Sequence, residues 1–245
     1  MKKLIVANWK MNPASSKEAQ RFFSSLARGL RGSRAEVVVC PPFCYLPLAK
    51  SKVFKIGAQD CFWKEKGAFT GQVSPLMLKN LGVRYVIVGH SEKRALGETD
   101  ETVNEKLKAV LKAGLTPVLC IGETAEQRRK KETFKTVERQ LKKALEKLTR
   151  AKLSKLVIAY EPVWAISPNP ACSVDEAETM ILFTRKTLNK IAGRKYSKTV
   201  KVIYGGNANG ENAGDFLSSP WIDGLLVGAA SLRIKEFLGM TKKSV

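Results

Sequence analysis

The sequence is poor in the residues that build metal sites and disulfide frameworks. It contains one histidine, His90, and an odd number of cysteines, five, at positions 40, 44, 61, 120 and 172. No two of these cysteines form a CxxC pair, so we expect no zinc site, and reduced thiols are the simplest interpretation. The sequence therefore predicts a protein without a bound metal.

Long apolar runs are also missing. Near the N-terminus, Lys2 and Lys3 precede an apolar run that ends after four residues, at Asn8. A run this short cannot form the core of a signal peptide. No other stretch approaches the roughly 18 apolar residues that a membrane span requires. We therefore expect a soluble, cytoplasmic protein with no membrane partner.

Acidic residues are scarce relative to basic ones. The chain has 22 Asp and Glu against 43 Lys and Arg, a net charge of +21, and residues 128–152 are especially basic. In that segment apolar residues recur at helical spacing, so the cations fall on the outer face of an amphipathic helix. The recurring residues are Val137, Leu141, Ala144, Leu145 and Leu148. Phe134 is the only aromatic there, so a solvated helix face is favoured over a nucleic-acid surface.

Apolar, strand-like runs alternate with helical stretches along the whole chain. We expect strands near 4–8, 36–40, 55–59, 84–88, 116–121, 155–161, 200–204 and 222–227. We expect helices near 16–30, 45–49, 75–81, 100–113, 125–149, 174–192, 210–218 and 230–238. The strand runs are nearly continuous, as in a parallel sheet buried on both faces. Eight strand–helix units over residues 1–245 predict a single α/β domain that closes into a (β/α)8 barrel.

One carboxylate stands at the end of a predicted strand. Glu161 follows the apolar run 155–160 and directly precedes Pro162. A buried strand seldom carries an acid, because removing a carboxylate from water without a partner costs several kcal/mol. The carboxyl ends of barrel strands are where catalytic groups gather. Glu161 is therefore a candidate general base.

Other strand ends carry groups that complement this acid. Asn8 and Lys10 are two residues apart and so face the same way in an extended chain, and His90 follows the fourth strand. Two turns of small residues, 204–207 and 227–230, each open a helix, and their backbone N–H groups suit a phosphate. Each feature alone is more often structural. Together they predict proton transfer beside the carbonyl of a small phosphorylated substrate.

Six motifs give the sequence a resemblance to the triosephosphate isomerase family. They are Asn-Trp-Lys-Met-Asn (8–12), Gly-Ala-Phe-Thr-Gly (67–71), Gly-His-Ser-Glu (89–92), Cys-Ile-Gly-Glu (120–123), Ala-Tyr-Glu-Pro-Val-Trp-Ala-Ile (159–166) and Tyr-Gly-Gly (204–206). The set is highly specific and spans nearly the whole chain. The resemblance implies a TIM barrel and an aldose–ketose isomerase of glycolysis and gluconeogenesis. Such an enzyme interconverts glyceraldehyde 3-phosphate and dihydroxyacetone phosphate through an enediolate.

The resemblance also implies roles for single residues. Glu161 would move the proton between the two carbons, and His90, kept neutral by a helix that starts near Ser91, would polarise the carbonyl. Lys10 would stabilise developing negative charge, and Asn8 would orient the substrate. Residues that support the site from behind would be Ser91, Glu92, Cys120 and Tyr204. No metal or organic cofactor is implied, because the proton lost by carbon is returned to it.

The chain departs from the family pattern where the phosphate would bind. Residues 165–170 read Ala-Ile-Ser-Pro-Asn-Pro, whereas the family usually has Ala-Ile-Gly-Thr-Gly-Lys there. Ser167 thus replaces a glycine, Asn207 a serine, and Ala229, after Gly228, a second glycine. Every one of these positions keeps a backbone N–H, so we expect all four to bind the phosphate. The two prolines leave less freedom at the loop tip, and we expect them to pre-form its closed state.

The segment 61–74 resembles the loop that inserts into the partner subunit in this family, with Thr70 at its tip. We therefore expect a homodimer. Gln72 and Lys93 replace a Glu and an Arg that are common in the family, so one cross-subunit ion pair is expected to be missing.

Two other functions remain open at this point. The barrel could serve a different isomerase whose substrate choice is altered by residues 167–170. It could also be a non-catalytic, phosphate-binding barrel that acts through its basic surface on RNA or acidic partners. The intact set of Asn8, Lys10, His90 and Glu161 favours triose phosphate isomerisation, and a nucleic-acid partner is not expected.

Overall fold

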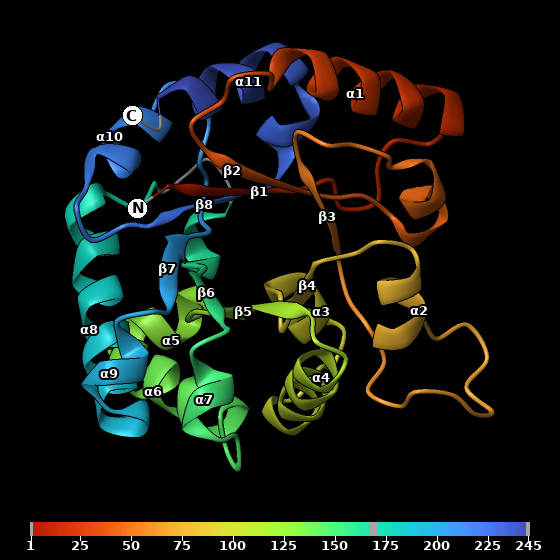
Figure 1. The fold of residues 1–245 in the computed structure, drawn as a ribbon. Coiled ribbons are helices and arrows are strands. Elements are labelled where there is room, and N and C mark those ends of the chain that lie inside the picture. Colours follow the sequence, from red (N-terminus) through yellow and green to blue (C-terminus); the bar gives the residue numbers. More distant parts are fainter. Residues whose placement is uncertain (1, 167–170, 244–245) are drawn as a thin grey trace.

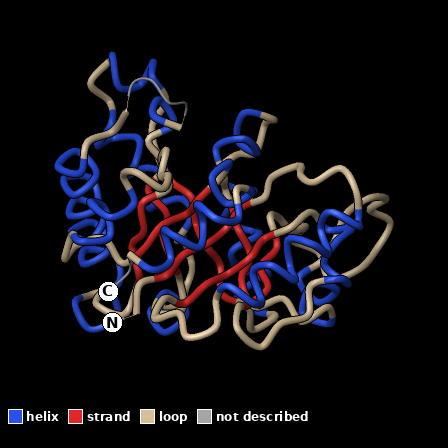
Figure 2. Tube along the Cα trace, turned by 90° about the horizontal axis from the view of Figure 1, so that it is seen from above, coloured by secondary structure: helices blue, strands red, loops and turns tan. Residues whose placement is uncertain are grey.

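The computed structural model describes residues 2–166 and 171–243. Eight parallel strands form a closed barrel in chain order, with helices around it (Figure 1), and Figure 2 shows the strands at the centre. The strands are β1 (Leu4–Asn8), β2 (Glu36–Cys40), β3 (Lys55–Ala58), β4 (Tyr85–Val88), β5 (Thr116–Ile121), β6 (Val157–Tyr160), β7 (Lys201–Tyr204) and β8 (Gly224–Val227). Pairing of β1 with β8, from Leu4 opposite Gly224 onward, closes the ring. The predicted (β/α)8 barrel is confirmed.

Both faces of the strands are covered, which explains their continuous apolar sequences. One set of side chains, including Val6, Val38 and Ile87, fills the barrel interior, and a larger set packs between the strands and the helices. Several predicted strands were too long at their amino-terminal ends. Leu156 and Ile222 are buried but lie before β6 and β8, because they pack into the core without joining the hydrogen-bonded ladder.

The helical elements follow the strands as expected, with some short additions. The α-helices are α1 (Ser16–Gly29), α2 (Pro75–Asn80), α3 (Ser91–Ala95), α4 (Asp100–Lys112), α5 (Ala125–Arg129), α6 (Thr133–Ala144), α7 (Arg150–Leu153), α8 (Val174–Ala192), α9 (Arg194–Ser197), α10 (Ala213–Ser218) and α11 (Ile234–Lys242). Three 3-10 helices are η1 (Phe43–Leu48), η2 (Val163–Ala165) and η3 (Ala229–Leu232). The predictions for 16–30, 75–81, 100–113 and 174–192 are confirmed to within one residue at each end.

The single helix predicted for residues 125–149 is wrong. The chain forms α5, α6 and α7 instead, and Lys131 and Lys147 adopt left-handed backbone angles, φ 58° and 61°, which interrupt the helix. The predicted helix near 230–238 is likewise divided into η3 and α11. Hydrophobic periodicity shows which face is buried, but it does not show where the backbone turns.

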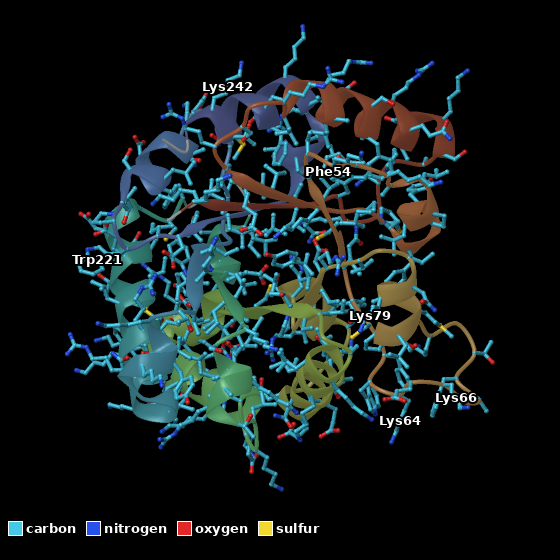
Figure 3. All side chains as sticks on the ribbon, in the orientation of Figure 1. Phe54, Lys64, Lys66, Lys79, Trp221 and Lys242 are labelled. Carbon is cyan, nitrogen blue, oxygen red and sulfur yellow. The ribbon has the colours of Figure 1, made fainter. Side chains whose placement is uncertain are left out.

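The basic segment does present its cations to solvent. On α6, Val137 and Leu141 are buried, whereas Lys135 and Lys142 are exposed. Figure 3 shows further lysines, such as Lys242 on α11, pointing outward. In residues 2–166 and 171–243 no helix has both the length and the apolar character needed to cross a membrane.

Candidate active site

A cavity of about 320 Å³ lies where the carboxyl ends of β1, β4, β6, β7 and β8 meet. It brings together most of the residues singled out in the sequence: Asn8, Lys10, His90, Glu161, Asn207, Gly228 and Ala229. Ser167 lies outside the described residues, as does the rest of the 167–170 stretch. A larger groove of about 730 Å³ lies between the starts of β2 and β3, but it contains neither His90 nor Glu161.

Asn8 and Lys10 are held by a strained turn at the end of β1. Lys10 has a φ of 53°, an angle that costs a residue with a side chain roughly 1–2 kcal/mol. The Oδ1 atom of Asn8 accepts a hydrogen bond from the backbone N–H of Lys10 at 3.1 Å, and Gln59 donates to the Lys10 carbonyl at 2.8 Å. The Lys10 ammonium lies 2.5 Å from a carboxylate oxygen of Glu92. Such strain at the edge of a polar cavity is typical of functional sites.

His90 caps the amino-terminal end of α3. Its Nδ1 accepts a hydrogen bond from the backbone N–H of Glu92 at 3.2 Å. A ring nitrogen that accepts a hydrogen bond carries no proton of its own, so this contact fits the ring tautomer with its proton on Nε2. Nε2 lies 3.2 Å from Oε1 of Glu161, and both residues line the cavity. The helix start predicted near Ser91 therefore supplies the backbone N–H that orients the ring.

Glu161 is almost completely buried, with 2% of its surface exposed. Its Oε2 accepts a hydrogen bond from the backbone N–H of Ser91 at 3.1 Å. Its Oε1 makes no hydrogen bond, despite its closeness to His90. Gly205 makes room for the side chain, since a Cβ atom there would lie 2.9 Å from Cγ of Glu161. The site thus contains a buried carboxylate with one oxygen left unpartnered, which is costly unless a ligand uses it.

Cys120 and Tyr204 lie behind the cavity. Burial, reinforced by the charge of Glu161, raises the pKa of the Cys120 thiol well above its ordinary value. The thiol therefore stays protonated and is a poor nucleophile. Tyr204 stacks on Phe216 with ring centres 4.0 Å apart.

The opposite wall is built from backbone. In the part of the chain that the structure describes, the N–H groups of Gly228 and Ala229 make no hydrogen bond to another residue. Asn207 differs from the expectation, because its N–H donates to the carbonyl of Ala165 at 3.1 Å. Gly206 lies so close to Tyr204 that a Cβ atom would come within 2.2 Å of the tyrosine hydroxyl.

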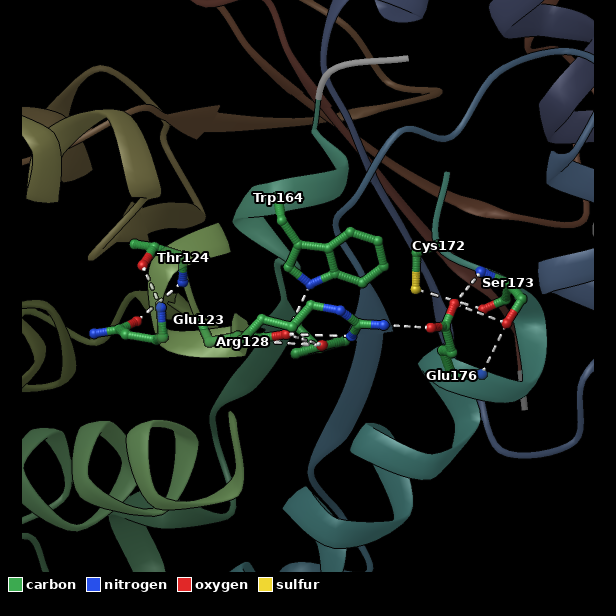
Figure 4. A network of polar contacts seen from close by, with 9 residues as sticks. Glu123, Thr124, Arg128, Trp164, Cys172, Ser173 and Glu176 are labelled. Carbon is green, nitrogen blue, oxygen red and sulfur yellow. Dashed lines mark hydrogen bonds and ion pairs between the residues drawn. The ribbon is translucent and has the colours of Figure 1, made fainter. Parts of the chain in front are cut away.

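A polar network centred on the buried Glu123, which was not predicted from the sequence, lies beside the site (Figure 4). Glu123 accepts hydrogen bonds from Trp164 at 2.7 Å and from the Tyr160 hydroxyl at 3.1 Å. Burial raises the pKa of Glu123, whereas these hydrogen bonds act in the opposite direction. Arg128 stacks on Trp164, 3.9 Å from the ring centre, and pairs with Glu176 at 2.6 Å. The network anchors η2, which leads into residues 167–170. Its sequence signal was Glu123, a second acid just after an apolar strand.

No group of three or more His, Cys, Asp or Glu side chains that could hold a metal ion occurs among residues 2–166 and 171–243. The cavity offers a carboxylate, an imidazole, an ammonium, the guanidinium of Arg233 and backbone N–H groups as its chemistry.

A sequence profile of the family described as "Triosephosphate isomerase" matches residues 3–244. The chain belongs to the triosephosphate isomerase family. Among its relatives, the triosephosphate isomerase of Alkaliphilus oremlandii is 42% identical over 244 residues, which is 98% of each chain. That of Citrifermentans bemidjiense is 43% identical over 249 residues, 99% of each chain. That of Moorella thermoacetica is 44% identical over 240 residues, 96% of this chain and 95% of the relative. The family resemblance and the prediction of an aldose–ketose isomerase are thus confirmed.

Proposed function

We propose that the protein interconverts glyceraldehyde 3-phosphate and dihydroxyacetone phosphate, with Glu161 as the base. The observation that carries this proposal is the unpartnered Oε1 of a buried carboxylate, 3.2 Å from Nε2 of His90. A base must have a free lone pair, and an acid beside it must hold a proton. Glu161 and His90 satisfy these two conditions at one wall of a cavity large enough for a three-carbon phosphate.

Each remaining polar group has a place in this reaction. Glu161 removes a proton from the carbon next to the carbonyl, and the Nε2–H of His90 donates to the carbonyl oxygen as negative charge develops there. The Lys10 ammonium stabilises the same charge, and Asn8 orients the substrate. The substrate phosphate accepts from the N–H groups of Gly228 and Ala229. Asn207 can add to this wall only if its N–H leaves the Ala165 carbonyl, and Ser167 stays a predicted phosphate contact. Because Glu161 returns the proton to the neighbouring carbon, the reaction needs no redox cofactor.

A coupled assay with glyceraldehyde 3-phosphate tests this proposal. We expect turnover without added metal and with no change after treatment with a chelator. Turnover of another phosphorylated aldose, but not of the triose, would support the different isomerase considered above. Absence of any turnover, together with tight binding of RNA, would support the non-catalytic barrel. A cytoplasmic location stays a prediction.

The net positive charge should speed capture of the anionic substrate. The cavity's own cations are neutralised, since Lys10 pairs with Glu92 and Arg233 with Glu236. Steering must therefore come from the field of the whole surface, which salt screens over about 8 Å at physiological ionic strength. We expect kcat/KM to fall about threefold to tenfold between 0.01 and 0.15 M salt, at constant kcat. A flat profile of kcat/KM would show that capture is not assisted by charge.

We also propose that the protein is a homodimer that uses residues 61–74. This segment extends beyond α2 (Figure 1), and Thr70 on it is exposed. Two large apolar side chains are left in water: Met11, 94% exposed, follows β1, and Leu96, 82% exposed, caps the end of α3. Lys93 pairs with Asp60 of its own chain at 3.0 Å, in keeping with a missing cross-subunit ion pair.

The substitution Met11→Lys should separate the subunits. It places a charge where we expect an apolar contact, whereas Leu182→Lys on α8 changes a side chain that is 40% exposed and distant from that surface. Sedimentation analysis should show a dimer for the parent and for Leu182→Lys, and at least a tenfold weaker dimer for Met11→Lys. A monomeric parent, or equal effects of the two substitutions, would contradict this proposal.

A further inference from the structure

Gln140 is a buried polar side chain on α6 that none of the roles above uses. It is 4% exposed and lies on the same helix face as the buried residues Val137 and Leu141. Its Oε1 accepts a hydrogen bond from the backbone N–H of Gly122 at 2.8 Å, and its Nε2 donates to the carbonyl of Gly122 at 3.1 Å. One side chain therefore satisfies both backbone polar groups of a single residue.

Gly122 lies directly against the backbone of the proposed base. A Cβ atom on Gly122 would come within 1.7 Å of the Glu161 carbonyl oxygen, so no other residue fits here without movement. The residues on either side bind the same segment: the N–H of Glu161 donates to the Ile121 carbonyl at 2.7 Å, and that of Val163 donates to the Glu123 carbonyl at 3.1 Å. The short segment 121–123 is thus the surface on which the Glu161 backbone rests.

A hollow of about 550 Å³ borders this contact and is lined by Gly122, Gln140, Ser91 and Val163, among others. Because of this space, side-chain packing does not fix the position of segment 121–123 on that side. Water entering the hollow could satisfy the Gly122 backbone groups, but it would not fix their position. The two hydrogen bonds of Gln140 supply a fixed attachment to a long helix.

We propose that Gln140 is a positioning residue for the catalytic base. By holding Gly122, it fixes where the Glu161 backbone lies and hence where its carboxylate stands relative to His90 and the substrate carbon. This inference rests on the proposed role of Glu161. Since a misplacement of about 1 Å can cost roughly 10²-fold in rate, loss of the attachment should slow proton transfer more than it weakens binding.

The structure offers a matched control in Asn104 on α4. Asn104 is buried too, and its Nδ2 donates to the backbone carbonyls of Ala144 at 2.8 Å and Glu146 at 2.9 Å. It therefore also ties the carboxyl end of α6 to its surroundings by two hydrogen bonds from one amide, one turn beyond Gln140. A general loss of stability should be similar in Gln140→Met and Asn104→Leu, whereas a loss of positioning should occur in Gln140→Met alone.

The experiment compares parent, Gln140→Met, Gln140→Asn and Asn104→Leu as full chains, at a temperature where melting curves show all of them folded. We expect kcat to fall about tenfold to fiftyfold in both Gln140 variants, with KM within threefold of the parent and kcat within twofold in Asn104→Leu. A substrate deuterated at the carbon that loses its proton gives a second measurement. Its isotope effect on kcat should rise in the Gln140 variants and not in Asn104→Leu.

Equal losses of kcat in the Gln140 and Asn104 variants would overturn the inference, as would an unchanged isotope effect. If Gln140→Met does not fold, Gln140→Asn decides, because its shorter amide still fills the site with a polar group but cannot reach both Gly122 atoms. The role of Glu161 is tested separately on an otherwise unchanged chain, so failure of one conclusion can be told from failure of the other.

Discussion

Replacement of Glu161 by Gln should lower kcat by about 10²–10⁴-fold or more, while a non-reacting substrate analogue still binds. The amide has nearly the shape of the carboxylate and can still accept a hydrogen bond from the Ser91 N–H, which in the parent donates to Oε2 at 3.1 Å. What it lacks is the basic lone pair that Oε1 presents beside His90. The variant should therefore keep its fold and its phosphate-binding wall but lose proton transfer.

Steady-state kinetics and analogue binding check this expectation together. Glu138→Gln serves as the control, because Glu138 is a half-buried carboxylate of α6 that pairs with Lys142 and lies outside the cavity. That variant should remain within twofold of the parent. A Glu161→Gln enzyme with kcat within tenfold of the parent would end the case for Glu161 as the base.

Replacement of His90 by Gln should lower kcat by about 10²–10³-fold and change KM much less. The imidazole accepts a backbone hydrogen bond from Glu92 on Nδ1, which leaves Nε2 as the ring nitrogen that we propose donates to the substrate. A glutamine can reach the same region and donate from its amide, but it cannot pass a proton from one oxygen to the other. The substitution should therefore weaken stabilisation of the transition state more than binding of the substrate, which lowers kcat more than it changes KM.

The ratio of the two kinetic constants decides the role of His90. If kcat is unchanged and KM rises, then His90 only binds substrate. A useful second measurement is the amount of inorganic phosphate released per turnover, because an enediolate that is slow to be reprotonated has more time to eliminate phosphate.

The site residues that can be predicted from sequence are polar or ionisable residues that stand at the end of an apolar strand. Glu161 and His90 are polar groups at the ends of apolar runs, and the barrel topology then requires that they meet. Glu123 has the same signal but a different environment, because Tyr160 and Trp164 occupy its oxygens and leave none facing the cavity. A buried acid that acts as a base differs from one with a structural role in the hydrogen-bond partners of its oxygens. The position of the acid in the sequence does not reveal these partners.

Gln140 and Asn207 show a second limit. Gln140 occupies a position that helical periodicity assigns to the core. A polar residue is unexpected there, and only the structure gives the reason, which is its two hydrogen bonds to Gly122. The N–H of Asn207 is present in any sequence, but whether it is free depends on the Ala165 carbonyl to which it donates. The sequence also did not predict the division of 125–149 into α5, α6 and α7. The left-handed backbone angles at Lys131 and Lys147 that cause it do not change the spacing of apolar residues.

The pairing of β1 with β8 bears on when the chain becomes active during its synthesis. β1 ends in Asn8 and leads into Lys10, which leave the ribosome before the other strands of the barrel, whereas the turn with Gly228 and Ala229 follows β8, the last strand of the barrel. A nascent chain that already contains Glu161 and His90 has the proposed base and acid but neither a closed ring nor a complete wall for the phosphate. It therefore cannot hold an enediolate away from water. Catalysis should begin only when β8 has been released and pairs with β1. A chain that ends before β8 should therefore be inactive and should not form an enediolate that eliminates phosphate.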